Sequence, residues 1–402
     1  MIDDDRRTVR RIAFLTPEFL TEAHASGGIG NYVAKMSMAL AAQGVSVEVF
    51  VPSTVDGEVS YKGIRVHRVR SVRSWAARGL AKLLGVFVGS RGRVVLHLLN
   101  ARALAAAVER RHREAPFDAV QSANHHLTGF CLRAVPGRVH AIRISTSRRL
   151  YDHGGGPLHR AMAGLIERLD VAAMRRADVA YAPSAFLAGH FSDRYGLRVE
   201  VLRPPAELGG APAEEVPFDL PPKYLVHFGS LGPRKGTDAV ARALIEAWES
   251  EPDLRMVWAG PLDDRDLRAF RTSWGAQSDR VDVLGLLEKD VLYRVIAGAT
   301  AAVLPSTVDN LPNTVIESLA LGVPVIGSDG ASIDELVEHE SSGLLVAIGD
   351  EATLARAMIV AWRERATWLG DGFVPPAILL DMRSDRAVAS LLSLLANVAV
   401  RA

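Results

Sequence analysis

The sequence predicts an α/β protein made of two Rossmann-like domains. Short apolar runs alternate with helical patterns along the whole chain, and a proline- and glycine-rich stretch interrupts this alternation near the middle. The length of 402 residues also suits two domains. Alternation of this kind is typical of parallel sheets built from strand–helix–strand units, which bind ligands at the carboxyl ends of their strands.

The expected strands follow one another at regular spacing. They cover 12–15, 45–51, 119–122, 141–145 and 179–182 in the first half, and 224–228, 255–259, 281–284, 301–304, 324–326 and 344–347 in the second. Helical patterns lie between them, for example over 30–43 and 237–249. We therefore expect one parallel sheet in each half of the chain.

The break lies at 203–222, a stretch rich in proline that also carries Gly209 and Gly210, which is typical of a domain linker. We expect a first domain over 1–205 and a second over 206–379, with ligand bound in the cleft between them. An apolar helix pattern closes the chain. This last helix, at about 380–402, either crosses back to the first domain or stays on the second.

Composition narrows the class of protein. Hydrophobic residues make up 49% and charged residues 23%, as in a globular protein, and the net charge of +1 gives no general reason for nucleic-acid binding. The single cysteine, Cys131, excludes an internal disulfide framework. The N-terminus lacks the apolar segment of a signal peptide, and no run reaches the roughly 18–20 apolar residues of a membrane span. We expect a cytoplasmic location.

The most informative segment is 305–317, directly after the expected strand 301–304. It places Asp309 in a loop and Glu317 about one turn inside the following helix. Main-chain N–H groups at the start of a helix bind phosphate well, and carboxylates accept hydrogen bonds from hydroxyl groups. The combination predicts a site for a sugar nucleotide.

Two further loops follow expected strands. The first contains Gly27 and Gly28 within Ser-Gly-Gly-Ile-Gly-Asn and lets the main chain approach a phosphate or a sugar. The second, 229–236, ends in Arg234 and Lys235, cations that can neutralise the charge of a departing diphosphate.

Polar side chains also follow two strands of the first domain. His125 comes soon after the expected strand 119–122 and is a candidate hydrogen-bonding or acid–base group, although a structural loop histidine is the alternative. Arg143 interrupts an apolar strand, and a buried charge needs a partner, which a ligand could supply.

Together these segments resemble the family 4 glycosyltransferases, which are retaining enzymes with the GT-B fold. In that fold two Rossmann-like domains face each other across a cleft. The resemblance rests on two acids separated by seven residues, Asp309 and Glu317, on the following Gly-Val-Pro-Val strand, and on the Lys-Gly that ends 229–236. This chain has Asp309 where glutamate is commoner, and Ser230 where arginine is frequent.

The resemblance implies specific roles for these residues. Glu317 would bind the ribose hydroxyls of a nucleotide sugar, and Lys235 the diphosphate. His125 is expected near the sugar, and Asp309 with the amides of Asn310 and Leu311 on it. The amides of Asn313, Thr314 and Val315 and the loop with Gly27 and Gly28 are expected toward the diphosphate. Ser230, Arg234 and Arg143 are further donor-binding candidates, Arg234 as a second cation and Arg143 facing either donor or acceptor. A UDP-sugar is the first expectation and a GDP-sugar the second. The acceptor is a hydroxyl of a glycan, a glycolipid or a natural product, and no metal or other cofactor is expected.

Other interpretations stay open. A sugar-nucleotide epimerase or a non-catalytic sugar-nucleotide-binding subunit would carry the same donor site. Residues 62–102 contain no acid and many cations, a pattern that favours a phosphorylated acceptor, an acidic sugar or an anionic membrane surface, or merely a solvated face. Asp264-Arg265-Asp266 has the form of a metal-binding motif, but is more typical of the first turn of a surface helix.

Overall fold

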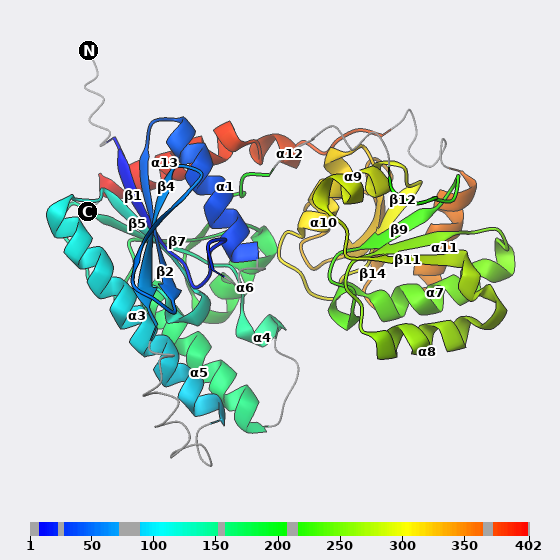
Figure 1. The fold of residues 1–402 in the computed structure, drawn as a ribbon, viewed down its shortest axis with the longest axis horizontal. Coiled ribbons are helices and arrows are strands. Elements are labelled where there is room, and N and C mark those ends of the chain that lie inside the picture. Colours follow the sequence, from blue (N-terminus) through cyan, green and yellow to red (C-terminus); the bar gives the residue numbers. More distant parts are fainter. Residues whose placement is uncertain are drawn as a thin grey trace. The chain divides into compact units, whose positions relative to one another are not determined.

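The computed structural model describes residues 8–22, 28–71, 89–151, 157–206, 216–364 and 373–400. The chain divides into two compact units (Figure 1). Unit 1 comprises 1–205 together with 384–402, and unit 2 comprises 206–383. The chain therefore completes unit 2 before it returns to unit 1 for its last helix. Where unit 2 starts and stops, the Ala206 N–H donates to the Met382 carbonyl at 2.8 Å.

Within the described residues, unit 1 holds an eight-stranded sheet in the order β3-β4-β2-β1-β5-β6-β7-β8. All neighbouring strands are parallel except β3 and β4, which form an antiparallel pair at one edge. The strands are β1 (Arg11–Leu15), β2 (Ser46–Ser53), β3 (Gly57–Tyr61), β4 (Ile64–Arg70), β5 (Ala119–Ala123), β6 (Val139–Arg143), β7 (Val179–Ala182) and β8 (Val199–Val201). The helices are α1 (Gly28–Ala42), α3 (Gly89–Glu114), α4 (Arg148–Tyr151), α5 (Pro157–Met174), α6 (Ala185–Tyr195) and α13 (Ser384–Ala399), with a short 3₁₀ turn, η1 (His125–Leu127).

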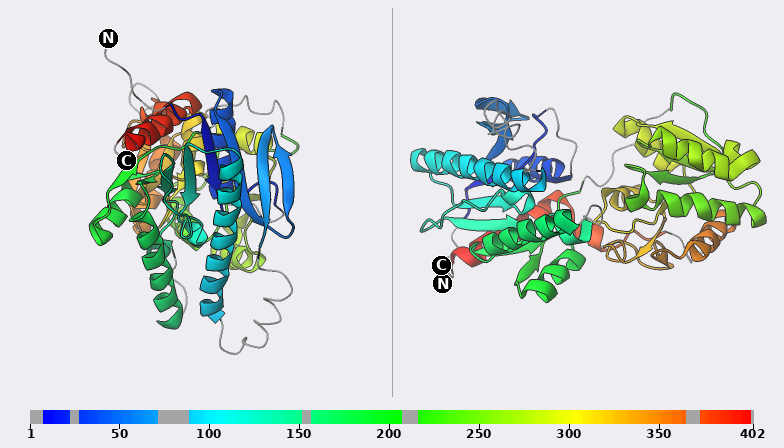
Figure 2. Two further views of the ribbon diagram at one scale, coloured as in Figure 1. Left: turned by 90° about the vertical axis from the view of Figure 1, so that its left-hand side faces the viewer. Right: turned by 90° about the horizontal axis from the view of Figure 1, so that it is seen from below.

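Helices cover both faces of this sheet (Figure 2). On one face α1 and α13 bring Met36 and Leu391 into a shared apolar cluster with side chains of β1 and β2. On the other face α3 brings Leu104 and Val108 against β1 and β5. Because Leu391 is fully buried, the last helix of the chain is part of the core of unit 1.

Unit 2 has a six-stranded sheet, β11-β10-β9-β12-β13-β14, that is parallel throughout the described residues. The strands are β9 (Leu225–Phe228), β10 (Met256–Ala259), β11 (Val281–Gly285), β12 (Ala301–Leu304), β13 (Val325–Asp329) and β14 (Gly343–Ala347). The helices are α7 (Thr237–Ser250), α8 (Asp264–Trp274), α9 (Lys289–Ala297), α10 (Asn313–Ala320), α11 (Glu351–Arg363) and α12 (Ile378–Asp381), with 3₁₀ turns η2 (Pro233–Lys235) and η3 (Gly275–Arg280). Side chains of α7 and α11 pack on one face of the sheet, and those of α9 and α10 on the other.

Each strand predicted from an apolar run is present, with small shifts at its ends. The sequence prediction missed β3, β4 and β8. In β4 apolar residues are interrupted by arginines and a histidine, β3 is mostly exposed, and β8 has only three residues, so none of the three forms an apolar run. Asp264 and Asp266 lie in the first turn of α8, where Asp263 caps the helix, so the surface-helix interpretation of this segment is confirmed.

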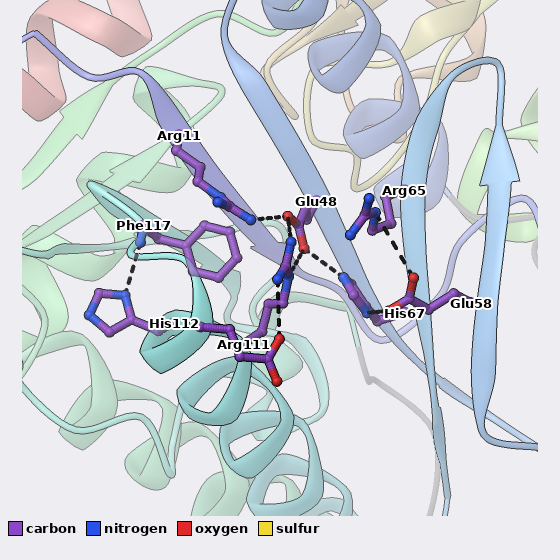
Figure 3. A network of polar contacts seen from close by, with 9 residues as sticks. Arg11, Glu48, Glu58, Arg65, His67, Arg111, His112 and Phe117 are labelled. Atoms are coloured by element: carbon purple, nitrogen blue, oxygen red, sulfur yellow. Dashed lines mark hydrogen bonds and ion pairs between the residues drawn. The ribbon is translucent and has the colours of Figure 1, made fainter.

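A buried carboxylate joins four elements of unit 1 (Figure 3). Glu48 on β2 accepts hydrogen bonds from Arg11 on β1 and from Arg111 Nε on α3 at 2.9 Å, and lies 2.6 Å from His67 Nε2 on β4. Burial alone would raise the pKa of Glu48, but the hydrogen bonds from His67, Arg111 and Arg11 outweigh it and hold the pKa well below its usual value. The carboxylate therefore stays charged and ties α3 to the sheet.

A buried histidine plays the corresponding part in unit 2. His227 on β9 is fully buried, with Nδ1 2.7 Å from the Val303 carbonyl on β12 and Nε2 2.9 Å from Thr237 Oγ1. The Thr237 hydroxyl in turn accepts the Gly232 N–H at 2.8 Å. Burial, with a smaller contribution from Lys235, lowers the pKa of His227 to about 4. The neutral ring thus connects two strands to the loop after β9.

We expect this histidine to make the folded state sensitive to acid. Since its pKa rises to about 6.5 on unfolding, the unfolded chain binds more protons between these values, so stability is complete above pH 6.5 and falls as the pH drops toward 4. Between pH 7 and 5 the loss from His227 is about 2 kcal/mol. Urea unfolding of the wild type and of His227→Gln at both pH values measures it. The variant should lose about 2 kcal/mol less than the wild type, and equal losses would contradict the assignment.

Candidate functional site

Two loops at the carboxyl edge of the unit 2 sheet lie against each other. They are 229–236, which follows β9, and 305–312, which follows the adjacent strand β12. The Thr307 N–H donates to the Arg234 carbonyl at 3.0 Å. Gly236 has φ +76°, and a Cβ there would lie 2.1 Å from the Pro305 carbonyl oxygen. Only glycine allows this approach, so the glycine after Lys235 fixes how the two loops meet.

The meeting of these loops pairs the cation and the acid predicted from sequence. Lys235 Nζ lies 2.6 Å from Asp309 Oδ2, and the two side chains are 14% and 19% exposed. The other oxygen of Asp309 accepts the N–H of Asn310 at 2.9 Å. The structure thus brings Lys235 and Asp309 together in a partly buried ion pair.

Three of the predicted donor-binding amides have partners within the protein. The Asn310 amide donates to Asp309, as above, and the Leu311 amide donates to Ser332 Oγ at 2.6 Å. The Val315 amide donates to the Pro312 carbonyl at 3.1 Å. The Asn313 and Thr314 amides, also predicted to bind phosphate, lie in the first turn of α10. Among the described residues they have no hydrogen-bond acceptor.

Glu317 lies in the second turn of α10, on the same side of the unit 2 sheet as α9. The Tyr293 hydroxyl of α9 donates to its Oε1 at 3.4 Å. The start of α10 lies close to the loop after β9, because a Cβ on Gly229 would lie 3.1 Å from Thr314 Cγ2. The predicted Ser230 and Arg234 are also in that loop, and both are exposed. Unit 2 therefore gathers Lys235, Asp309 and the first turns of α10 at one edge of its sheet.

In unit 1, Arg143 ends β6 and is 8% exposed. Its guanidinium lies 3.8 Å from the centre of the Tyr32 ring, and Nη1 donates to Ser145 Oγ at 2.6 Å. Its Nε is buried without a hydrogen bond, and within the described part of the chain Arg143 forms no ion pair. A buried cation with an unused donor suits an anionic ligand.

His125 lies in η1, after the strand next to β6. Its Nδ1 is buried and has no hydrogen-bond partner among the described residues. Burial first, then the nearby Arg148 and His97, lower the pKa of His125 to about 4, so the ring is neutral near pH 7. The neighbouring His126 has φ 58°, and its ring stacks on that of His97 with 4.2 Å between centres.

Gly28 is the first residue of α1, while Gly27 lies outside the described residues. Glu18, in the loop after β1, accepts the Gly30 N–H at 3.2 Å. A carboxylate of the protein thus lies at the first turn of α1, and the expectation that this glycine loop faces a diphosphate stays a prediction. The sequence prediction missed Glu18, although its place in the loop after the first expected strand was a usable signal.

A cavity of about 320 Å³ lies at the carboxyl edge of the unit 1 sheet. Loops after β1, β2, β4 and β5 and one side of α3 form its wall. The polar residues among those lining it are Glu18, Glu22, Ser53, Thr54, Ser71, His97, Asn100, His126 and Thr128. Carboxylates, imidazoles, hydroxyls and an amide together can bind many hydroxyl groups of a ligand. The volume lies at the lower end of the roughly 300–1,000 Å³ of small-molecule sites.

The acid-free stretch 62–102 is only partly described. Arg68 pairs with Glu22 at 2.8 Å, an acid from outside the stretch, and Arg65 lies 4.0 Å from the exposed Glu58. Arg73, Arg78 and Lys82 lie outside the described residues. No helix in the described part of the chain is long and apolar enough to cross a membrane. Nor do the described residues contain a group of three or more His, Cys, Asp or Glu arranged to hold a metal ion.

Comparisons with known proteins show the family of this chain. A family model described as "Glycosyl transferase 4-like domain" matches residues 27–205, and one described as "Glycosyl transferases group 1" matches 222–364. A D-inositol 3-phosphate glycosyltransferase of Acidothermus cellulolyticus is 25% identical over 87% of this chain and 82% of its own length.

Solved structures show the same fold. Sucrose-phosphate synthase of Thermosynechococcus elongatus has a TM-score of 0.69 at 18% identity, covering 98% of this chain and 97% of its own. The Anabaena protein HepE in complex with UDP-glucose has a TM-score of 0.66 at 17% identity, covering 98% of this chain and 100% of its own. With two Rossmann-like units, glycosyltransferase models matched over both, and a paired lysine and acid at the predicted site, the chain belongs to the family 4 glycosyltransferases, enzymes of the GT-B fold that transfer a sugar from a nucleotide sugar.

Proposed function

We propose that this protein is a retaining glycosyltransferase that moves a sugar from a UDP-sugar, or failing that a GDP-sugar, to a hydroxyl of a small polar acceptor. The supporting observation is the convergence of Lys235, Asp309 and the start of α10 at one edge of the unit 2 sheet. A lysine and helix N-terminal amides suit a diphosphate, and a carboxylate suits sugar hydroxyls.

The ribose, the diphosphate and the sugar of the donor would each contact different residues along this edge. Glu317 would accept hydrogen bonds from the ribose hydroxyls, and its distance of 3.4 Å from the Tyr293 hydroxyl supports its orientation. The Asn313 and Thr314 amides with Lys235 would hold the diphosphate. Asp309 would exchange its bond with Lys235 for hydroxyls of the transferred sugar, as Lys235 turns to the diphosphate.

The transfer step would need no nucleophile from the protein. The bond between the sugar C1 and the diphosphate oxygen breaks, and the acceptor oxygen forms its bond to C1 from the same face. The proton of the acceptor hydroxyl passes to an oxygen of the leaving phosphate. Lys235 and the α10 amides would stabilise the charge on that phosphate, which is the work that a metal ion does in other transferases. We therefore propose transfer without a metal or other cofactor.

Donor binding can be tested by thermal unfolding with UDP, GDP, ADP and dTDP in the absence of metal. One nucleotide should raise the stability, by about 2.7 kcal/mol at 100 times its dissociation constant. Glu317→Ala should abolish this shift because the ribose contact is lost, whereas Glu246→Ala, the same change at an exposed position of α7, should keep it. If no nucleotide stabilises the wild type, both the transferase and the epimerase interpretations are wrong.

We propose further that the acceptor binds in the unit 1 cavity. Its polar wall and its volume of about 320 Å³ suit a single sugar or cyclic polyol better than a long chain. The strained φ of His126 supports this, because non-glycine residues in the left-handed region often cluster at functional sites.

For the acceptor site, we expect Asn100→Ala to raise the KM for the acceptor about ten-fold, since one hydrogen-bonding wall residue is lost. The nucleotide shift should stay unchanged. Asn397→Ala, at an exposed position of α13, is the control. Turnover is measured with glucose, mannose, myo-inositol and inositol 3-phosphate, and proton NMR of the product should show the donor's anomeric configuration. Conversion of the donor sugar without an acceptor would identify an epimerase, and binding without any turnover a binding subunit.

A contact with an anionic membrane surface is also part of the proposal. On α3, Val95 and Leu99 lie one turn apart and are 57% and 41% exposed, and the exposed Arg102 follows them. Exposed apolar residues beside cations suit a membrane surface. Co-sedimentation with vesicles containing anionic lipid should therefore be positive, and it should decrease when Arg73, Arg78 and Lys82 are replaced by glutamine. Absence of binding by the wild type would end this part of the proposal.

A further inference from the structure

A strained turn follows β13 at the same edge of the unit 2 sheet as the candidate donor site. Ala331 and Ser332 have φ 52° and 58°, and the Ile333 N–H closes the turn onto the Gly330 carbonyl at 3.0 Å. Left-handed positions of this kind are usually occupied by glycine or asparagine, because a Cβ is strained there. Ala331 and Ser332 are neither glycine nor asparagine, so both positions are strained.

The turn packs on the apolar core of unit 2. Ile333 is fully buried in the apolar cluster between the sheet and α10, and a Cβ on Gly327 would lie 2.6 Å from its Cγ2. Ala331 and Ser332 are also buried. Because Ala331 and Ser332 are buried next to Ile333, their main chain cannot leave the left-handed conformation without disturbing the core of unit 2.

The turn contacts the loop that carries Asp309. The Ser332 hydroxyl accepts the Leu311 N–H at 2.6 Å and donates to the Asp309 main-chain carbonyl at 3.5 Å. Leu311 itself has φ 52°. Thus three of the seven non-glycine residues with positive φ in the described chain meet at this one contact. Strain of this kind persists only where the surroundings enforce it, and it concentrates at functional sites.

This contact has a direct consequence for Asp309. Its carboxylate faces Lys235 and the Asn310 amide, while its main-chain carbonyl and the amide two residues later are bound by Ser332. The serine hydroxyl thus holds both ends of the loop 309–311, its oxygen as acceptor at Leu311 and its hydrogen as donor at Asp309. Removal of the hydroxyl leaves the buried Leu311 amide without its acceptor and frees the loop to move.

We propose that Ser332 is a positioning residue for the donor sugar: its hydroxyl sets the place of the Asp309 carboxylate and thereby determines how the enzyme distinguishes a nucleotide sugar from the bare nucleotide. The proposal rests on the proposed function, in which Asp309 binds the sugar while Glu317 and Lys235 bind the nucleotide. Ser332 acts through Asp309 and touches neither substrate nor leaving group.

The test compares two ligands on the whole protein by calorimetry, UDP and UDP-glucose, or GDP and GDP-mannose if GDP is the stabilising nucleotide. Ser332→Gly removes the hydroxyl and also relieves the strain, so the variant is expected to fold. Its affinity for the bare nucleotide should change less than about two-fold, whereas the affinity for the nucleotide sugar should fall about ten-fold. If Ser332 had a purely structural role, the variant would lose affinity for both ligands to the same degree.

Two further variants make the result specific. Ala331→Gly relieves the neighbouring strain and leaves the hydroxyl in place, so both affinities should stay at the wild-type values. In an Asp309→Ala background the Ser332→Gly change should have no further effect, because a positioning residue acts only through the group that it positions.

Equal losses for both ligands, unchanged affinity for the nucleotide sugar, or a full Ser332→Gly effect without Asp309 would each overturn the proposal. Failure of the proposed function would look different. In that case the wild type would bind no nucleotide in a manner that depends on Glu317, before any change at Ser332 is made.

Discussion

Parallel strand pairing is the constraint on which the remaining structure depends. Because neighbouring strands run in the same direction, their carboxyl ends share one edge of the sheet, and every loop that leaves them starts there. In unit 2 this edge carries the loops after β9, β12 and β13, and so Lys235, Asp309 and Ser332 become neighbours although they are far apart in sequence. In unit 1 the same constraint collects the cavity wall from the loops after β1, β2, β4 and β5.

Charged side chains are paired differently at the carboxyl edges of the sheets and away from them. Away from the carboxyl edge of unit 1, Glu48 is surrounded by Arg11, Arg111 and His67 and serves only to join elements (Figure 3). At the edges the charges are less completely matched. Among the described residues, Arg143 rests on an aromatic ring with its Nε unbonded, and Lys235 pairs with one carboxylate, which also accepts an amide N–H. Complete networks hold the fold, and incomplete ones can accept a ligand.

The sequence was sufficient for the parallel sheets and for the segments that carry the site, because buried parallel strands form continuous apolar runs and polar loops follow them. It could not show that Lys235 and Asp309 pair, since 74 positions separate them and only the adjacency of β9 and β12 brings them together. Ser332 had no local signal at all. Ala-Ser is an ordinary dipeptide, and its left-handed conformation is imposed by the packing of Ile333 and by the loop above it.

The hydrogen bond between Ala206 and Met382 closes unit 2 on itself, so this unit is a continuous insertion into unit 1. Unit 1, in contrast, needs Leu391 and Leu395 of α13 to complete its apolar core. A ribosome releases the chain from its N-terminus, and domains generally fold as units during synthesis. All of unit 2 therefore leaves the ribosome before unit 1 has received its last helix. The second unit in the sequence is the first that can finish folding. Until residues 384–399 have been made, unit 1 lacks α13, and α1 alone packs in the place that the two helices later share.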